Sequence, residues 1–187
     1  MMTLDNLQLF NGQKSVLFDS VGAEGVTILL AVMASLIKQG IPVFLVSPTE
    51  TMKRFKMLLR KLNVPDLTLL EAQGKFKFSN QSSNAYDPKY FLVIHGASFL
   101  PIDNLVSLID RPNTLLHVHK DLNDKLVTYL IRHVNLILDL CALPSGFSPQ
   151  IFGRLSMYPG GQYSAVVKSA KSFNVIAADS SVTLVDA

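Results

Sequence analysis

The segment with the clearest potential for chemistry is residues 17–30, LFDSVGAEGVTILL. An apolar run, a short loop with glycines and a second apolar run predict a strand, a tight turn and a helix. In this setting, the P-loop pattern G-x-x-x-x-G-K-[ST] binds phosphates through backbone N–H groups at the helix N-terminus. Here Ser20 takes the first glycine position, Gly25 the second, Val26 the lysine and Thr27 the hydroxyl residue. The sequence therefore predicts a degenerate P-loop that keeps the turn and lacks the charge.

Two replacements argue against nucleotide hydrolysis. The P-loop lysine contacts the β- and γ-phosphates, and Val26 cannot do so. Magnesium would need a carboxylate at the end of a later apolar strand, where YFLVIHG instead places His95–Gly96, although magnesium prefers oxygen ligands. We therefore expect no enzymatic activity, no catalytic residues and no cofactor. An ordinary strand-to-helix turn of an unrelated α/β fold also explains the spacing in residues 17–30.

Histidines are the other candidate ligands in the chain: His95, His117, His119 and His133. His117 and His119 are two residues apart in a predicted strand, so they share a face and could share a metal ion. No third ligand follows at a recognisable spacing, so structural or surface roles are favoured and no metal site is predicted. Ser145 in LPSGF lacks the G-x-S-x-G setting of a nucleophile elbow.

Strands and helices alternate along most of the chain. The predicted strands are 15–19, 41–47, 67–72, 90–96, 114–120 and 136–143. The predicted helices are 25–39, 50–62 and 104–110, with a loop and a helix in 121–134. Continuous apolar strands such as IPVFLVS are typical of parallel sheets that are covered on both faces. The polar residues 74–89 predict a surface loop.

The C-terminal part changes to short antiparallel strands. Residues 153–158 run back along the preceding strand, and 163–170 and 173–187 follow, with a turn at Asp179 and Ser180. The whole pattern predicts an α/β fold with a mainly parallel central sheet, flanking helices and C-terminal antiparallel strands, the layout of a RecA-like domain. Residues 1–187 are expected to form a single domain.

Composition narrows the setting of the protein. Of the 187 residues, 49% are hydrophobic and 17% charged, which favours a well-buried sheet. The net charge of +3 does not by itself indicate nucleic-acid binding. Cys141 is the only cysteine, so no internal disulfide forms and a reducing compartment is expected. No membrane span or signal peptide is predicted. The expected location is the cytoplasm, with the nucleus as a second compartment.

The segment 134–161 carries a more specific pattern: an apolar strand, L-x-[small]-G-F, and G-x-L opening a return strand. The matching positions are Leu143, Ser145, Gly146, Phe147, Gly153 and Leu155. This arrangement resembles the sixth subunit of the Elongator complex. The opening strand, lysine-free loop, helix and second strand in residues 15–50 are also similar to that family, and the likeness extends over roughly residues 14 to 187.

This resemblance implies a non-catalytic, RecA-like subunit. Members of the family assemble with the fourth and fifth Elongator subunits, two copies of each, into a hexameric ring that binds tRNA. The ring supports wobble-uridine modification by the catalytic subcomplex, and it has been linked to ATP-regulated release of tRNA. The chain departs from the family in a shorter stretch before residue 90 and in His95–Gly96, so another subunit of the ring stays open as an identity.

Candidate contacts to nucleic acid are Lys120 and Lys125, which lie just after the strand at 114–120. In ring-forming RecA-like proteins, such loops line the pore. Asp121 and Asp124 offset the two lysines, so the electrostatic signal is weak. Three alternatives remain from the sequence: a RecA-like recombination accessory protein that binds DNA, an active nucleotide-binding enzyme with an irregular P-loop, and a small α/β scaffold.

Overall fold

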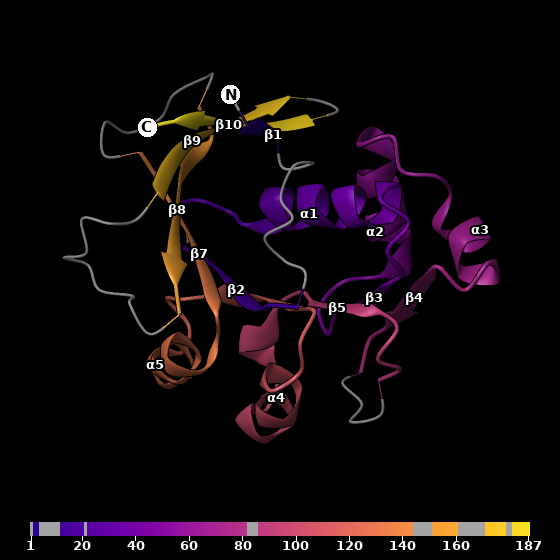
Figure 1. Ribbon diagram of the computed structural model, residues 1–187, viewed down its shortest axis with the longest axis horizontal. Coiled ribbons are helices and arrows are strands. Elements are labelled where there is room, and N and C mark those ends of the chain that lie inside the picture. The colour runs from indigo at the N-terminus through magenta and orange to yellow at the C-terminus, as the bar shows by residue number, and fades with distance from the viewer. Residues whose placement is uncertain are drawn as a thin grey trace.

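The computed structural model describes residues 2–3, 12–20, 22–81, 86–143, 151–160, 171–178 and 181–187. A ten-stranded sheet runs through them in the order β1-β10-β9-β8-β7-β2-β6-β5-β3-β4 (Figure 1). Its strands are β1 (Met2–Thr3), β2 (Lys14–Asp19), β3 (Val43–Val46), β4 (Phe76–Ser79), β5 (Phe91–Ile94), β6 (Thr114–His119), β7 (Leu136–Cys141), β8 (Gly153–Pro159), β9 (Lys171–Ala178) and β10 (Ser181–Asp186). The helices are α1 (Val26–Lys38), α2 (Met52–Lys61), α3 (Leu67–Ala72), the short 3-10 helix η3 (Ala97–Phe99), α4 (Ile102–Ile109) and α5 (Asp124–His133).

The strands from β7 to β4 are parallel, and helices cover both faces of this part (Figure 1). Helices α1 and α2 lie on one face, and α4 and α5 lie on the other. Alternate strand residues feed two separate cores: Leu17 packs with α1, whereas Val16 and Phe18 pack on the side of α4 and α5. Full burial on both faces explains why these strands read as continuous apolar runs. The predicted fold class is confirmed.

Strands β8, β9, β10 and β1 continue the sheet in antiparallel pairs and curl over α1 (Figure 1). Residues 28–36 of α1 are all buried. Val182 and Leu184 of β10 belong to the same core as α1, so the antiparallel strands help to cover this helix. The far edge of β10 pairs with β1, so β10 is not the outermost strand.

Residues 67–72 were predicted as a strand, and this prediction is wrong because they form α3. Asp66 caps that helix by accepting a hydrogen bond from the Thr68 N–H, and the spacing of buried Leu67 and Leu70 is helical. The strand that follows α3 along the chain is β4, and it lies within the predicted surface loop 74–89. Its alternation of lysine and phenylalanine is a period-two signal that the polar composition of the surrounding segment concealed.

Side-chain caps mark the starts of two other helices. Thr51 caps α2 by accepting from the Arg54 N–H, and Asn123 caps α5 by accepting from the Leu126 N–H. The predicted strand at 163–170 and the turn at Asp179 and Ser180 lie outside the described residues. Within the described ranges, none of the helices is long and apolar enough to cross a membrane.

Candidate functional site

Polar side chains gather at the carboxyl ends of neighbouring parallel strands. Asp19 ends β2, Ser47 follows β3, His95 follows β5, and His117 and His119 end β6. In open α/β sheets, ligands bind in the crevice beyond these strand ends. The degenerate P-loop, between β2 and α1, lies at the same edge of the sheet. The fold therefore brings two separately predicted features, the loop and the histidines, to one site.

The carboxylate of Asp19 closes the loop, although no local sequence pattern marks this residue. The Gly25 N–H donates to Asp19 Oδ2 at 2.6 Å, and the Ala23 N–H donates to the Ser20 carbonyl at 3.0 Å. A Cβ added at Gly25 would lie 3.1 Å from both Asp19 Cβ and His117 Nε2, so glycine permits this close approach. Val26 is half-buried and packs against the core on the side of α1. An internal carboxylate thus occupies an N–H group of the kind that phosphates bind in a P-loop.

Asp19 is completely buried. Burial alone raises the pKa of its carboxyl group, but the hydrogen bond and charge of His117, the Gly25 N–H and the charge of His119 outweigh that effect. The pKa of Asp19 consequently lies below its ordinary value. A carboxylate at the N-terminus of a helix is further favoured by the helix dipole. Asp19 is therefore an anion at neutral pH.

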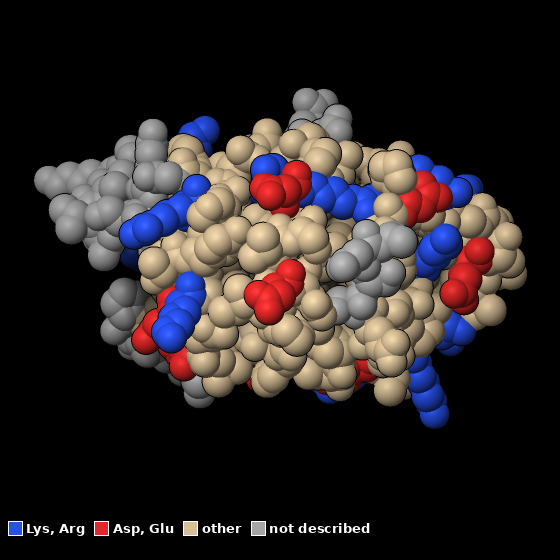
Figure 2. Space-filling view, turned by 90° about the horizontal axis from the view of Figure 1, so that it is seen from below, with Lys and Arg blue, Asp and Glu red and all other residues tan. Residues whose placement is uncertain are grey.

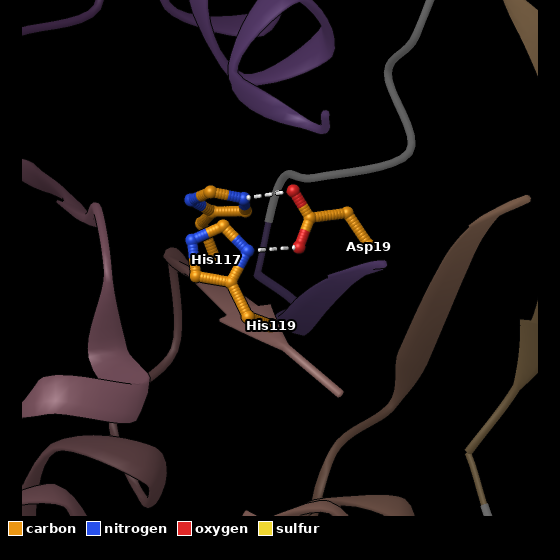
Figure 3. A group of neighbouring side chains, drawn as sticks. All are labelled: Asp19, His117 and His119. Carbon is orange, nitrogen blue, oxygen red and sulfur yellow. Dashed lines mark hydrogen bonds and ion pairs between the residues drawn. The ribbon is translucent and has the colours of Figure 1, made fainter. Parts of the chain in front are cut away.

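Both histidines of β6 point at this carboxylate, one to each oxygen (Figure 3). His117 Nε2 lies 2.8 Å from Asp19 Oδ2, and His119 Nδ1 lies 2.6 Å from Oδ1. The second contact is close but not aligned as a hydrogen bond, since Oδ1 has no hydrogen-bond partner in the described structure. His117 is buried, whereas the side chain of His119 is 32% exposed. The same-face prediction for the two histidines is confirmed, and Asp19 supplies the third group.

His95 is buried beside Asp19, His117 and His119. Its Nδ1 lies 3.0 Å from Ser47 Oγ, and its ring stacks on His117 at 5.1 Å and meets the edge of Phe55 at 5.5 Å. Burial contributes most to lowering the pKa of His95 to about 4. The charges of His117, His119 and Arg54 lower it further. His95 is thus a neutral, buried imidazole at the strand end where a nucleotide-hydrolysing enzyme would need a carboxylate for magnesium.

The two predicted nucleic-acid contacts differ sharply. Lys120 Nζ lies 2.7 Å from Asp139 Oδ1 and 3.4 Å from Cys141 Sγ. Burial lowers the pKa of Lys120, but the hydrogen bond and charge of Asp139 outweigh this and raise it. Lys120 is therefore tied to an internal ion pair, whereas Lys125 is exposed on α5.

Lys125 borders a shallow hollow of about 390 Å³ on α5. The hollow is lined by Asp124, Lys125, Thr128, Tyr129, Arg132 and His133. The rings of Tyr129 and His133 stack at 4.0 Å, with 15° between their planes. Aromatic faces beside cations are the groups that bind single-stranded nucleic acid. We call this surface the α5 hollow.

The family-signature residues that the structure describes have structural roles. Leu155 is completely buried in the core, and Leu143 is half-buried. A Cβ added at Gly153 would lie 2.9 Å from the carbonyl oxygen of Cys141, so glycine allows β8 to pack against β7. Gly146 and Phe147, with Ser145, lie outside the described residues.

No protein-family model and no curated protein matches the chain. Solved structures do match. An uncharacterized protein of Pyrococcus horikoshii, solved in complex with an unknown peptide, has a TM-score of 0.66 and 11% identity, with 95% of this chain and 93% of that chain covered. The flagellar accessory protein FlaH of Methanocaldococcus jannaschii has a TM-score of 0.64 and 11% identity over 95% and 91% of the two chains.

A KaiC-like protein of Pyrococcus horikoshii OT3 is a third neighbour, with a TM-score of 0.60 and 14% identity over 94% of this chain and 90% of that one. Identities this low show the fold alone. The chain therefore has a RecA-like fold, with a mostly parallel central sheet extended by C-terminal antiparallel strands.

Proposed function

We propose that this chain is a non-catalytic, RecA-like subunit of the Elongator accessory ring. In this proposal it assembles with the fourth and fifth subunits into a hetero-hexamer that binds tRNA and supports wobble-uridine modification. The observation that carries the non-catalytic part is the hydrogen bond from the Gly25 N–H to the buried, ionised Asp19. The Elongator assignment rests on the sequence resemblance in residues 134–161.

Asp19 makes the loop a poor phosphate site on electrostatic grounds. A triphosphate at the N-terminus of α1 would meet the carboxylate charge instead of the lysine that normally offsets its own charge. At an effective dielectric constant of about 20, two like charges 4 Å apart repel by about 4 kcal/mol. Val26 offers no compensating cation. These facts favour a fold retained for its shape over a nucleotide-hydrolysing enzyme.

The α5 hollow is the surface best suited to tRNA. Lys125 and Arg132 are both exposed there, and the stacked pair of Tyr129 and His133 offers an aromatic face. Bases in unpaired RNA stack on such rings, and cations hold the phosphates. Asp124 reduces the local positive charge, so we assign the hollow a supporting contact within a larger ring surface.

Assembly into a ring needs apolar surface, and the chain exposes some beside the site. Phe99 is 54% exposed and Leu122 is 57% exposed. Both lie next to His119: the Phe99 ring is 6.1 Å from its ring, and the Leu122 N–H donates to its carbonyl. Figure 2 shows the face of the molecule that carries α4 and α5, where scattered charges of both signs interrupt a largely uncharged surface.

Co-expression with the fourth and fifth Elongator subunits tests the proposal. Native mass spectrometry is expected to show a hexamer with two copies of each chain. A control co-expression with only one of the partners distinguishes ring closure from pairwise association. A monomeric chain beside the other two subunits would exclude membership of the ring and favour the small α/β scaffold.

Binding measurements on the assembled ring test the tRNA contact. Charge reversal at Lys125 and Arg132 together is expected to weaken tRNA binding by about tenfold or more at fixed salt. The matched control reverses Lys53 and Lys61, two exposed cations of α2. Loss of affinity in the α2 variant alone would move the contact away from α5. Preference for duplex DNA over tRNA would favour the recombination accessory protein instead.

A nucleotide-binding measurement on the isolated chain distinguishes the non-catalytic subunit from an active nucleotide-binding enzyme. Calorimetric titration with magnesium and ATP is expected to give no heat of binding. Tight, magnesium-dependent binding that Thr27→Ala abolishes would instead identify an active site with an irregular P-loop.

A further inference from the structure

We propose that Asp19, His117 and His119 bind one divalent transition-metal ion, with zinc as the ion best suited to the site. Each of these residues offers a ligand atom, and the three atoms lie within 4.8 Å of one another. The inference concerns the chain by itself and does not depend on membership of the Elongator ring.

The donor set matches zinc. Two imidazole nitrogens and one carboxylate oxygen are common zinc ligands, and the same set also suits ferrous iron. Magnesium is disfavoured because it prefers oxygen ligands throughout. Asp19 is already ionised, which is the state that binds metal. The carboxylate that excludes phosphate from the loop is thus the group that attracts a cation.

The distances require only a small adjustment. Zinc bonds of about 2.0–2.2 Å place neighbouring ligand atoms of a tetrahedral site roughly 3.4 Å apart. His117 Nε2 and Asp19 Oδ2 are 2.8 Å apart, and His119 Nδ1 and Asp19 Oδ1 are 2.6 Å apart. These two contacts would lengthen by less than about 1 Å, and the most widely spaced ligand atoms, which lie within 4.8 Å of one another, would close by at most about 1.4 Å. The half-exposed ring of His119 can supply this adjustment, because its other side faces Phe99 and solvent.

The hydrogen bonding favours coordination over a purely structural network. Buried polar atoms in structural networks are usually satisfied. Here Asp19 Oδ1 lies close to an imidazole nitrogen but has no hydrogen-bond partner within the described structure. His117 is 1% exposed, so the contact at Nε2 is what orients its ring. A metal ion would be coordinated by Asp19 Oδ1, His117 Nε2 and His119 Nδ1.

The scaffold holds the three ligands rigidly. Asp19 and His119 are directly paired in the parallel register of β2 and β6, and His117 is stacked on His95. Ligands placed on paired strands are positioned more firmly than ligands on loops. Three protein ligands also leave a fourth coordination position, which would open toward solvent beside His119.

Zinc titration of the full chain tests this site. The chain is purified with any affinity tag removed, treated with chelator and dialysed against graded free zinc, and bound metal is measured by elemental analysis. We expect one zinc per chain. Cobalt(II) in place of zinc should give the visible absorption bands of a four-coordinate site.

Four variants locate the ion. His119→Gln and Asp19→Asn are each expected to weaken zinc binding by at least about tenfold. His133→Gln removes an exposed histidine on α5, and Cys141→Ser removes the only thiol; both are expected to bind zinc like the original chain. Circular dichroism checks that each variant is folded. Should Asp19→Asn fail to fold, His119→Gln decides, because its side chain is partly solvent-exposed.

Three results would overturn the proposal: no bound zinc, unchanged affinity in folded His119→Gln, or loss of the ion in His133→Gln or Cys141→Ser. Hexamer formation is measured separately on the same preparations. A chain that binds zinc without joining the ring would leave this inference standing and remove only the Elongator assignment.

Discussion

Asp19 determines the chemistry available at the P-loop. A nucleotide-binding loop keeps its N–H groups unoccupied so that phosphate can accept from them. Here one of them, the Gly25 N–H, already donates to Asp19, which is buried and ionised. The loop therefore carries a fixed negative charge at the N-terminus of α1, and Val26 stands where P-loops hold a lysine. Together these two features disfavour an anion at the loop and support the proposed cation site.

His95 makes folding stability depend on pH. Its pKa lies near 4 in the folded chain, against an ordinary value of 6.5, so the folded state favours the neutral ring. The contribution of His95 to the free energy of unfolding is fully present above about pH 6.5. It falls as the pH drops toward 4, because only the unfolded chain then takes up the proton. At pH 5, the loss amounts to roughly 2 kcal/mol. Urea unfolding at pH 7 and pH 5 in the presence of chelator measures it.

The matched variant is His95→Gln, which can still bond to Ser47 but does not titrate. Its loss of stability between pH 7 and pH 5 should be smaller than that of the original chain by about the same 2 kcal/mol. Identical pH dependence in the two chains would show that other groups are responsible.

Gly153 is predicted to be intolerant of even one added methyl group. Gly153→Ala places a Cβ 2.9 Å from the Cys141 carbonyl oxygen, a backbone atom that can move only if the β7–β8 pair moves. The free energy of unfolding should fall by about 1–3 kcal/mol. Gly22→Ala is the control, because its Cβ would meet Ala142 at an ordinary 3.4 Å. Equal effects of the two changes in urea unfolding would contradict this explanation.

At the scale of elements, the C-terminal strands complete the core around α1. Residues 28–36 of α1 include no exposed position, and the parallel sheet can cover only one side of a helix. Strands β9 and β10 curl over the other side. These strands therefore stabilise the fold, and in the proposed ring only their outer face is left for contact with another subunit.

Leu184→Ala tests this role of β10. Leu184 is completely buried in the core shared with α1, so its truncation should lower the free energy of unfolding by about 2–5 kcal/mol. Val185→Ala, a half-buried neighbour on the opposite face of the strand, should cost clearly less. Urea midpoints that shift equally in both variants would mean that β10 does not support α1.

At the scale of the whole molecule, exposed apolar residues that could contact another chain lie in different regions of the surface. Exposed apolar side chains lie beside His119 at Phe99 and Leu122, and a second pair lies at Met57 on α2 and Leu69 on α3. The first pair adjoins the carboxyl ends of the strands, near the candidate site. We expect that region to face a neighbouring subunit in the proposed ring.

Phe99→Ser combined with Leu122→Ser should weaken assembly with the fourth and fifth subunits. Each large apolar side chain buried in a contact contributes about 1.5–3 kcal/mol, which is roughly tenfold or more in the association constant. Met57→Ser combined with Leu69→Ser removes similarly exposed residues and should leave assembly unchanged. Native mass spectrometry across a dilution series compares the two. Stronger disruption by the control pair would place the interface on α2 and α3.

Local sequence patterns predicted much of this architecture. The buried parallel strands and the change to antiparallel strands follow from short-range periodicity and turn signals. The segment 67–79 was misread because a six-residue helix gives too short a period to distinguish from a strand. The degenerate loop was visible directly, since Val26 replaces a residue whose chemistry is known.

By itself, the sequence therefore determined the fold class, the loss of the P-loop lysine and the shared face of His117 and His119. Only the tertiary structure placed Asp19 beside both histidines and paired Lys120 with Asp139. It also decided that α1 is enclosed on every side. The physical reason is range: periodicity and capping act over a few residues, whereas Asp19 and His117 meet only because β2 and β6, 98 residues apart at that contact, pair in parallel.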